Sequence, residues 1–452
     1  MNAPVAAKQT CSDGAARAEA ATALGQSEAR KKLLFLAGTV PNPRFGGAPM
    51  RAYTQVLALA RYFDVVLVVQ SVHPDWTEND IPSAITEAVR EVHFVRAPAA
   101  LRQGRDWGEV IETLPGGLLL RALNLTPELC RKHFARAGPR EIASRLRGRS
   151  FDFIHCVRLT MLRTVESVVE VLSGRPGQIV VDLDDFESKT ALRRAEMAKP
   201  TMGRQIYYSY YLDALKFRFL ERRVVRLADA IMLCSSADCI EFNTQYRTFK
   251  ATVLPNTVAD RSSPSSTTTA HSRSLLFVGH LRYPPNVEAI KDFIANVLPK
   301  MRQLDPRSFT LRVVGVGADS FEFDAAANPE VETHADVPDL APYYQQASVV
   351  IAPIRWGGGT RIKIIEAFSF AKPVVATTIG AEGLDVTDGD NILVRDTHQD
   401  LAEACVSLLN DRATRDRLSI AARQLYLDKY STAAAEAQLA KLYGTAYSSS
   451  RL

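Results

Sequence analysis

The sequence predicts an α/β fold made of two doubly wound domains in series, and three observations predict it. First, 452 residues are more than one compact core usually accommodates, so two domains of roughly 200 residues are expected. Second, an apolar strand, a glycine-rich loop, a helix and another apolar strand follow one another between residues 32 and 70. Third, the alternation stops in a Ser- and Thr-rich stretch, residues 261–273, and then starts again.

The N-terminal half contains the apolar runs of a parallel sheet. Lys32–Ala37 is the first strand, and the Pro- and Gly-rich loop Thr39–Pro49 leads from it into a helix over Met50–Tyr62. The strands expected after this helix are Asp64–Gln70, Val92–Arg96, Phe151–Val157, Gln178–Leu183, Ala230–Cys234 and Thr252–Leu254. We assign residues 1–30 to a flexible leader and residues 31–260 to this first domain.

Residues 261–273 cannot bury apolar surface and are expected to be a linker. Beyond it, strands are expected at Ser274–Gly279, Thr310–Gly315, Ser348–Pro353, Pro373–Thr377 and Asn391–Val394. The expected helices are Val287–Val297, Leu340–Gln346, Arg361–Phe370 and others from Gln399 to about Tyr443. The second domain is assigned to residues 274–430, and residues 431–452 to a helix that packs back towards the first domain. A ligand is expected between the domains, at the carboxyl ends of the strands.

Composition narrows the class of protein. Hydrophobic residues make up 46% of the chain and charged residues 23%, as in ordinary globular proteins. The net charge of +5 is too mild for a dedicated nucleic-acid-binding protein, but it suits anionic substrates. The six cysteines form no Cys-x-x-Cys pair, which favours buried thiols in a reducing cytoplasm over disulfides or a zinc site. No apolar run of about 18 residues indicates a membrane span.

The most informative segment runs from Ala352 to Phe368, where an apolar strand passes through a glycine-rich turn into a helix. Its polar and glycine positions are Gly357, Gly358, Gly359, Thr360, Arg361, Lys363 and Glu366. Glycines let the backbone approach a ligand, and the N–H groups of a helix N-terminus bind anions. The basic side chains add positive charge, and the glutamate can accept hydrogen bonds from a ribose. The combination favours a diphosphate site over the simpler alternative, a tight strand–helix turn with a solvated basic first turn.

Four blocks, in this order and spacing, resemble the family 4 retaining glycosyltransferases (glycosyl transferases group 1), which have the GT-B fold of two Rossmann-like domains facing a cleft. The resemblance covers nearly the whole chain from about Lys32. The blocks are Arg44–Arg51, Glu221–Ser235 with Val253–Asn256, Phe277–Val287, and Ala352–Phe368 continued by Lys372–Thr377 and Gly380–Gly383. The resemblance implies a metal-independent enzyme that needs no cofactor. It would transfer a sugar, with retained configuration, from a UDP- or GDP-linked donor.

The resemblance also implies residues on the donor side. Those that bind the donor would be Gly46, Gly47, Gly279, Val337, Gly357, Gly358, Gly359, Thr360 and Glu366. The first two lie in a loop that faces the donor phosphate and the acceptor. Glu366 would hold the ribose, and Val337 lies in a loop that meets the base through main-chain atoms. Arg282, Arg361 and Lys363 would stabilise the leaving diphosphate, because cationic side chains bind phosphate oxygens strongly.

Two positions depart from the family. Gly358 stands where the family often has a glutamate, eight positions before Glu366, so one carboxylate near the transferred sugar is absent. A branch of the family with a Gly-rich loop followed by Thr-Arg-x-Lys shares this change. Many members have a lysine where Pro284-Pro285-Asn286 stands, which makes Arg282 the nearer candidate for the diphosphate.

Two strand ends of the first domain are expected to face the cleft. His155 lies where many relatives have a histidine after an apolar strand, and a half-buried structural histidine is an equal alternative. Asp182, Asp184 and Asp185 cluster at the end of the next apolar run. We expect Asp182 and Asp185 to include a catalytic or acceptor-orienting carboxylate and not to form a metal site. A set of helix N-terminal aspartates is the alternative.

Two basic stretches, residues 131–149 and 207–226, have two interpretations. They form either solvated helix faces or a contact with an anionic membrane surface. The resemblance implies that the first domain is the acceptor-side domain, for a glycan or a lipid-linked acceptor, and contact with a membrane would favour the lipid-linked one. The expected location is the cytoplasm, with peripheral contact at the inner face of the membrane as a further hypothesis.

Two other functions fit the same architecture. One is a sugar-nucleotide epimerase, and the other is a non-catalytic nucleotide-binding scaffold of a polysaccharide assembly complex. The glycine at 358 favours the scaffold, whereas the intact Arg282, Arg361, Lys363 and Glu366 favour catalysis. The usual roles of the family suggest polysaccharide or glycoconjugate biosynthesis.

Overall fold

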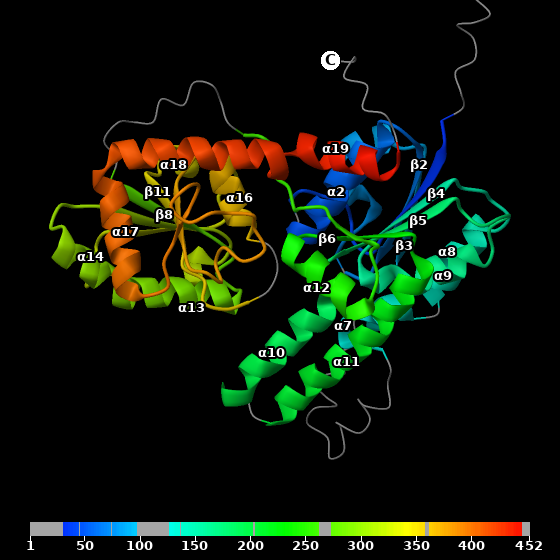
Figure 1. Cartoon of the computed structure of the whole chain (residues 1–452), viewed down its shortest axis with the longest axis horizontal. Helices are drawn as coiled ribbons and strands as arrows, with labels where there is room; N and C mark the ends of the chain where they lie inside the picture. Colours follow the sequence, from blue (N-terminus) through cyan, green and yellow to red (C-terminus); the bar gives the residue numbers. More distant parts are fainter. Residues whose placement is uncertain are drawn as a thin grey trace, which may run out of the picture.

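The structure is a computed structural model that describes residues 30–44, 46–73, 75–96, 126–135, 137–201, 204–261, 273–357 and 361–444. Nearly all of the predicted leader, most of the predicted linker and the last eight residues therefore lie outside the described residues. The described chain forms two α/β domains, each built on one parallel sheet, as the sequence predicts (Figure 1).

The first domain contains a seven-stranded parallel sheet in the order β3-β2-β1-β4-β5-β6-β7. Its strands are β1 (Lys32–Ala37), β2 (Asp64–Ser71), β3 (Glu91–Arg96), β4 (Phe153–Val157), β5 (Gln178–Asp184), β6 (Ala230–Leu233) and β7 (Ala251–Val253). Most strand residues are buried, which explains the continuous apolar runs in the sequence. The strand order reverses between β1 and β4, and ligands bind outside the carboxyl ends of strands at such a reversal.

Helices cover both faces of this sheet. They are α2 (Gly47–Ala60), α3 (Ser83–Ala88), α7 (Glu128–Phe134), α8 (Ala137–Leu146), α9 (Leu162–Val169), α10 (Glu187–Thr201), α11 (Arg204–Leu227) and α12 (Ser236–Tyr246), with the short turns η1 (Glu78–Asp80) and η2 (Leu159–Met161). Helices α10 and α11 pack along each other and project from the domain as a long hairpin (Figure 1).

The second domain contains a six-stranded parallel sheet in the order β10-β9-β8-β11-β12-β13. Its strands are β8 (Ser274–Val278), β9 (Thr310–Val314), β10 (Val331–His334), β11 (Val349–Ala352), β12 (Val374–Ala376) and β13 (Leu393–Val394). Its helices are α13 (Pro284–Asp292), η3 (Phe293–Val297), α14 (Leu298–Leu304), α15 (Ala341–Gln346), α16 (Ile362–Ser369), α17 (His398–Asn410) and α18 (Arg412–Leu425), with the turn η4 (Ala318–Ser320). Strand β10 was not predicted, because it is a four-residue edge strand in which only Val331 is buried.

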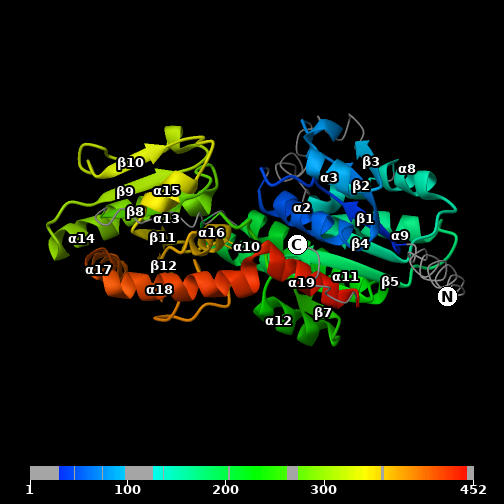
Figure 2. The same cartoon turned by 90° about the horizontal axis from the view of Figure 1, so that it is seen from above.

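The chain returns to the first domain at its C-terminal end. Helix α18 continues through η5 (Tyr426–Tyr430) into α19 (Thr432–Leu442), which lies against α2 (Figure 2). Ala435, Leu439 and Tyr443 pack into the same apolar cluster as Val56 and Leu59 of α2. No helix among the described residues is long and apolar enough to cross a membrane.

Candidate functional site

The two domains meet beside the carboxyl ends of β5 and β6. A small cavity of about 50 Å³ lies there, lined from the first domain by residues that include Asp185, Lys189 and Ser235, and from the second domain by Glu382 and Gly383. Arg193 of α10 crosses to Glu382 with two hydrogen bonds of 2.8 and 2.6 Å. The site is therefore built by both domains, where two facing α/β sheets are expected to bind a ligand.

On the second-domain side, the close approach of β8 and α16 depends on Gly279. A Cβ atom at this position would lie 3.1 Å from the Lys363 Nζ and 3.1 Å from the Asn286 side chain. Gly315 at the end of β9 is equally constrained, since its φ is +145° and an added Cβ would lie 2.0 Å from the Gly279 carbonyl oxygen. These glycines leave room for the Lys363 side chain of α16 beside the end of β8.

Lys363 and Glu366, less than one turn apart on α16, are partly buried charges with neutral partners. The Lys363 Nζ donates to the Asn286 Oδ1 at 2.8 Å and lies 4.2 Å from the centroid of the Phe277 ring. Burial lowers the pKa of Lys363 to about 7. The Tyr344 hydroxyl donates to Glu366 at 3.1 Å, and burial raises the pKa of this carboxyl. Neither group has a salt bridge within the described residues, so a ligand with an anion and hydroxyl groups would complement them.

Arg361 directly precedes α16 and is buried. Its Nη2 donates to the Gly357 carbonyl at 2.9 Å, and burial lowers its pKa, while Tyr283, Glu382 and Asp185 act to raise it. The Asp185 carboxylate of the first domain thus acts on the pKa of the Arg361 guanidinium. The predicted Gly358, Gly359 and Thr360 lie outside the described residues.

The remaining predicted donor-side residues surround this centre less tightly. Arg282 is exposed at the start of the loop before α13, and its side chain passes close to Gly317. Gly46, with φ of +102°, caps α2, and an added Cβ at Gly46 or Gly47 would meet no atom within 4 Å. Open space therefore lies in front of the start of α2. Val337 packs against the apolar cluster beneath α16.

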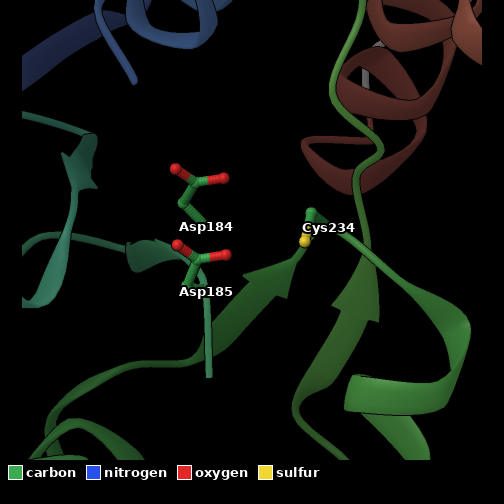
Figure 3. Close-up of side chains that lie close together, drawn as sticks. All are labelled: Asp184, Asp185 and Cys234. Carbon is green, nitrogen blue, oxygen red and sulfur yellow. The ribbon is translucent and has the colours of Figure 1, made fainter. Parts of the chain in front are cut away.

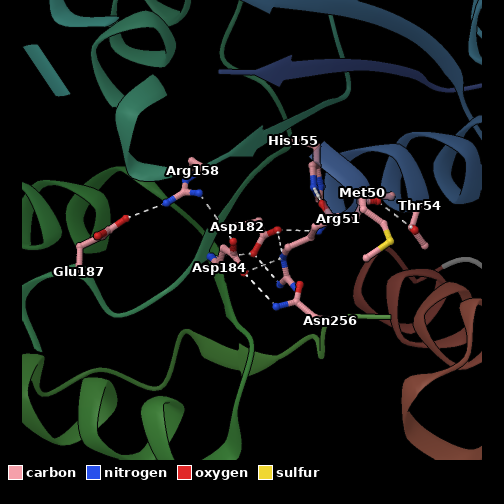
Figure 4. Close-up of polar contacts among 10 residues, drawn as sticks. Met50, Arg51, Thr54, His155, Arg158, Asp182, Asp184, Glu187 and Asn256 are labelled. Carbon is pink, nitrogen blue, oxygen red and sulfur yellow. Dashed lines mark hydrogen bonds and ion pairs between the residues drawn. The ribbon is translucent and has the colours of Figure 1, made fainter. Parts of the chain in front are cut away.

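His155 and Asp182 do not face the cleft, contrary to the expectation from their strand ends. Both are completely buried, and Figure 4 shows them among the polar contacts around Arg51. The His155 Nδ1 is 2.7 Å from the Tyr443 hydroxyl, and its Nε2 is 2.6 Å from the Gln55 Oε1. Burial lowers the pKa of His155 to about 4. The structure therefore favours the alternative of a structural, neutral histidine that links β4 to α2 and to the C-terminal end of α19.

Asp182 binds Arg51 in a buried, two-pronged ion pair. The Arg51 Nε and Nη2 donate to its two carboxylate oxygens at 2.7 and 2.8 Å, and Gln55 donates at 2.5 Å (Figure 4). Burial alone would raise the pKa of Asp182, but Arg51 and Gln55 outweigh it and the pKa is lowered. Asn256 accepts from the Arg51 Nη1 at 3.1 Å. The carboxylate has no oxygen left for a substrate, so Asp182 positions other groups.

Of the next two aspartates, Asp185 lines the cavity and Asp184 precedes it in the chain. Asp184 has a positive φ of 64°, and the register of β5 shifts between Asp182 and Asp184, which directs the chain into the site. Burial, helped by Asp184 and Glu187, raises the pKa of Asp185 to about 7, although Arg158 acts against it. Asp185 is the predicted catalytic carboxylate that lines the cavity.

Asp184, Asp185 and Cys234 also form a cluster of three groups that could ligate a metal ion (Figure 3). Their ligand atoms all lie within 4.8 Å of one another. Arg51 is 3.6 Å and Arg158 3.9 Å from Asp184, and these two guanidinium groups already supply the positive charge that a cation would bring. The arrangement therefore disfavours a cation, and metal independence stays a prediction.

The side chains that hydrogen-bond to the predicted site residues were not predicted from the sequence. Arg51 and Asn256 are the last residues of two of the blocks that carry the resemblance, and this position was the available sign of their role. Gln55, Tyr344 and Tyr443 carried no signal, because their partners lie 22 to 288 residues away along the chain.

Comparison with known proteins identifies the second domain. Residues 272–411 match the family model of the glycosyl transferases group 1. A D-inositol 3-phosphate glycosyltransferase of Corynebacterium diphtheriae is 27% identical over 194 residues, which cover 39% of this chain and 43% of that protein. An uncharacterized 44.6 kDa protein in the cps region of Klebsiella pneumoniae is 22% identical over 201 residues, or 42% of this chain and 49% of that protein. The chain thus matches less than half the length of these curated relatives.

Solved structures resemble the whole described chain. Anabaena Alr3699/HepE, in complex with UDP and glucose, has a TM-score of 0.57 at 15% identity and covers 92% of this chain and 100% of its own. Sucrose-phosphate synthase from Thermosynechococcus elongatus has a TM-score of 0.60 at 14% identity, and the match covers 92% of this chain and 98% of that protein's chain. At this identity the likeness shows the fold, so the predicted GT-B fold is confirmed. The predicted group 1 family is confirmed for residues 272–411, and the assignment to family 4 stays a prediction.

Replacing Arg51 should destabilise the protein strongly. Arg51→Ala leaves the Asp182 carboxylate buried without its counter-ion, which typically costs about 3–5 kcal/mol. Calorimetric melting should show this loss in the first domain. As a control, Arg61→Ala removes a surface ion pair with Glu436 and should cost less than about 1 kcal/mol. If Arg51→Ala does not fold, Arg51→Met/Asp182→Leu should recover part of the stability. Equal losses in Arg51→Ala and Arg61→Ala would contradict the role of the buried pair.

Proposed function

We propose, from the premise that residues 272–411 are a glycosyl transferases group 1 domain, that this chain is a retaining glycosyltransferase. It would transfer a sugar from a nucleotide diphosphate to a glycan or a lipid-linked acceptor, in polysaccharide or glycoconjugate biosynthesis. The observation that carries the proposal is the pair of partly buried charges Lys363 and Glu366 on α16, which have no salt bridge among the described residues and follow Arg361, a cation that faces Asp185 across the domain boundary. HepE was solved with UDP and with UDP-glucose, which supports a uridine-linked donor here.

The donor diphosphate would bind at the start of α16. The Arg361 guanidinium, the Lys363 ammonium and the free N–H groups of the helix all carry positive charge towards this point. Arg282, exposed at the edge of the loop, and the open space before Gly46 would complete the anion site. These groups stabilise the negative charge that grows on the diphosphate as the bond to the sugar breaks.

Glu366 would hold the ribose. A carboxylate accepts hydrogen bonds from two hydroxyl groups, and Tyr344 fixes one of its oxygens in place. Tyr344 is itself completely buried and stacks on Phe370, with ring centroids 4.9 Å apart, so the carboxylate has a rigid support. Val337 would pack beside the base, since it lies on the same apolar cluster as α16.

Asp185 is the group of the first domain best placed to act on the acceptor. A carboxyl with a pKa near 7 can take a proton from a hydroxyl group and give it up again near neutral pH. In the proposed step, the acceptor oxygen bonds to the sugar carbon while the bond from that carbon to the diphosphate breaks. The hydroxyl proton passes to Asp185, and the nucleotide diphosphate leaves. The proposed setting is the cytoplasm, with peripheral contact at the inner face of the membrane.

Donor binding should weaken as the pH rises. Lys363 is charged below its pKa of about 7, and a bound diphosphate would raise that pKa, so binding takes up a proton. Melting-temperature shifts with UDP, GDP, ADP and their sugars should identify the base. The shift should be larger at pH 6.5 than at pH 8.5 and unaffected by EDTA. Lys363→Met should bind weakly at both pH values. No shift with any nucleotide would contradict the donor site.

Removing the donor-binding charges should reduce turnover without unfolding the protein. Glu366→Ala and Arg361→Ala each lose hydrogen bonds to a charged group, so kcat/KM should fall by at least about tenfold. Glu403→Ala on the exposed face of α17 is the matched control and should keep wild-type activity. Product analysis without an acceptor separates transfer from epimerisation. Wild-type turnover in Glu366→Ala would show that the donor site lies elsewhere.

The pH dependence of kcat should reflect the ionisation of the Asp185 carboxyl. The group must be ionised to accept a proton, so kcat should rise with pH through about 7. Asp185→Asn should lower kcat by roughly 10²–10⁴-fold and remove this rising limb. Asp238→Asn, which replaces another carboxylate that lines the cavity, should retain the limb. An unchanged rising limb in Asp185→Asn would assign the titration to another residue.

A further inference from the structure

One face of α11 is apolar, basic and exposed. Along the hairpin helix from Ile206 to Leu227, the exposed side chains are Tyr208, Tyr211, Leu215, Arg218, Phe219, Arg222 and Arg226, which we call the α11 stripe. Successive members are one, three or four residues apart, so they lie along a single face of the helix. The two acidic residues of this segment, Asp213 and Glu221, are buried on the opposite side.

The part of the stripe nearest the hairpin turn is apolar. Tyr208, Leu215 and Phe219 are 50%, 44% and 48% exposed, and Tyr211 is 39% exposed. Large side chains in a continuous row are uncommon on the surface of a soluble protein and mark a contact with a membrane or another molecule. Single exposed residues such as Ile420 need no such explanation.

The part nearest the domain body is cationic. Arg218, Arg222 and Arg226 have no ion pair within the part of the chain that the structure describes. Arg223 is partly buried, lies 6.0 Å from the centroid of the Phe219 ring, and donates to Glu166 of α9 at 3.1 Å. The protein thus pairs the arginine that faces its own body and leaves three cations on the outer face beside the aromatic residues.

We propose that the α11 stripe docks on the surface of an anionic lipid bilayer. Tyr, Leu and Phe side chains insert at the boundary between headgroups and acyl chains, and the arginines bind lipid phosphates. The absence of any exposed acid from Ile206 to Leu227 gives the charge complementarity that favours an anionic lipid surface. Tyr208 and Arg226 are 18 residues apart, or about 27 Å along the helix, so the contact spans many lipid headgroups.

This docking would place the membrane next to the interdomain cavity. Helix α10 packs along α11 and carries Lys189 and Arg193 to the cavity wall. A lipid-linked acceptor could therefore reach the cavity from the bilayer surface. This consequence rests on the proposed function, whereas the docking itself does not.

Vesicle co-sedimentation of the whole protein tests the docking without donor or acceptor. Wild-type protein should bind phosphatidylcholine vesicles that contain phosphatidylglycerol, bind pure phosphatidylcholine weakly, and dissociate with salt. Arg218→Glu/Arg222→Glu should bind at least about 25-fold more weakly, at about fivefold for each charge removed. Leu215→Glu/Phe219→Glu should bind at least about tenfold more weakly. Circular dichroism and melting temperature check that each variant folds.

Matched substitutions on α18 provide the controls. Ile420 is 72% exposed, and Ile420→Glu and Arg412→Glu/Arg417→Glu should bind as the wild type does. Equal binding to both kinds of vesicle, or no loss in the α11 variants, would overturn the proposal. If the wild type bound neither kind of vesicle and instead formed a dimer that Leu215→Glu/Phe219→Glu dissociates, a second copy of the chain would occupy the stripe. That result would also overturn the proposal, while leaving the nucleotide-binding experiments unaffected.

Discussion

The organisation of the first domain around the cleft depends on the buried ion pair between Arg51 and Asp182. Only 4% of Arg51 and none of Asp182 is exposed. Removing two charges from water is costly, and a two-pronged arginine–carboxylate geometry offsets this cost only if further hydrogen bonds satisfy the remaining groups. Gln55 and Asn256 supply them. The pair therefore fixes three segments at once: the first half of α2, the end of β5, and the irregular segment that leaves β7 for the second domain.

The charged residues Lys363 and Glu366 of the second domain are arranged in the opposite way, because neither has an ion-pair partner among the described residues. Lys363 and Glu366 have neutral partners, Asn286 and Tyr344, and burial shifts both pKa values towards the uncharged forms. Arg51 and Asp182 neutralise each other and need nothing from outside, whereas the α16 pair gains most from a ligand that brings both an anion and hydroxyl groups. The contrast explains why the first pair is structural and why the second belongs to the proposed donor site.

The sequence predicted what local patterns encode. The parallel strands followed from continuous apolar runs, and the α16 residues followed from a short block in which turn, cations and carboxylate are within ten positions of one another. It failed for β10, whose edge position requires only one buried side chain, Val331. It also misplaced His155 and Asp182. Both lie within their strands, β4 and β5, and side chains from α2 cover them, with Tyr443 after α19 as a further partner of His155.

The contacts between the two domains differ in strength from one side to the other. Beside the cavity they include the partly exposed ion pair of Arg193 with Glu382, of a kind that contributes less than about 1 kcal/mol. At the other side, α19 buries Leu439 and Tyr443 in the core of the first domain. Burying one such side chain contributes about 1.5–3 kcal/mol. Because the α19 side is held more strongly, a bound donor can change the polar contacts beside the cavity at little cost while the C-terminal connection persists. For the proposed donor site, this difference in strength would allow the two halves to close about a fixed edge.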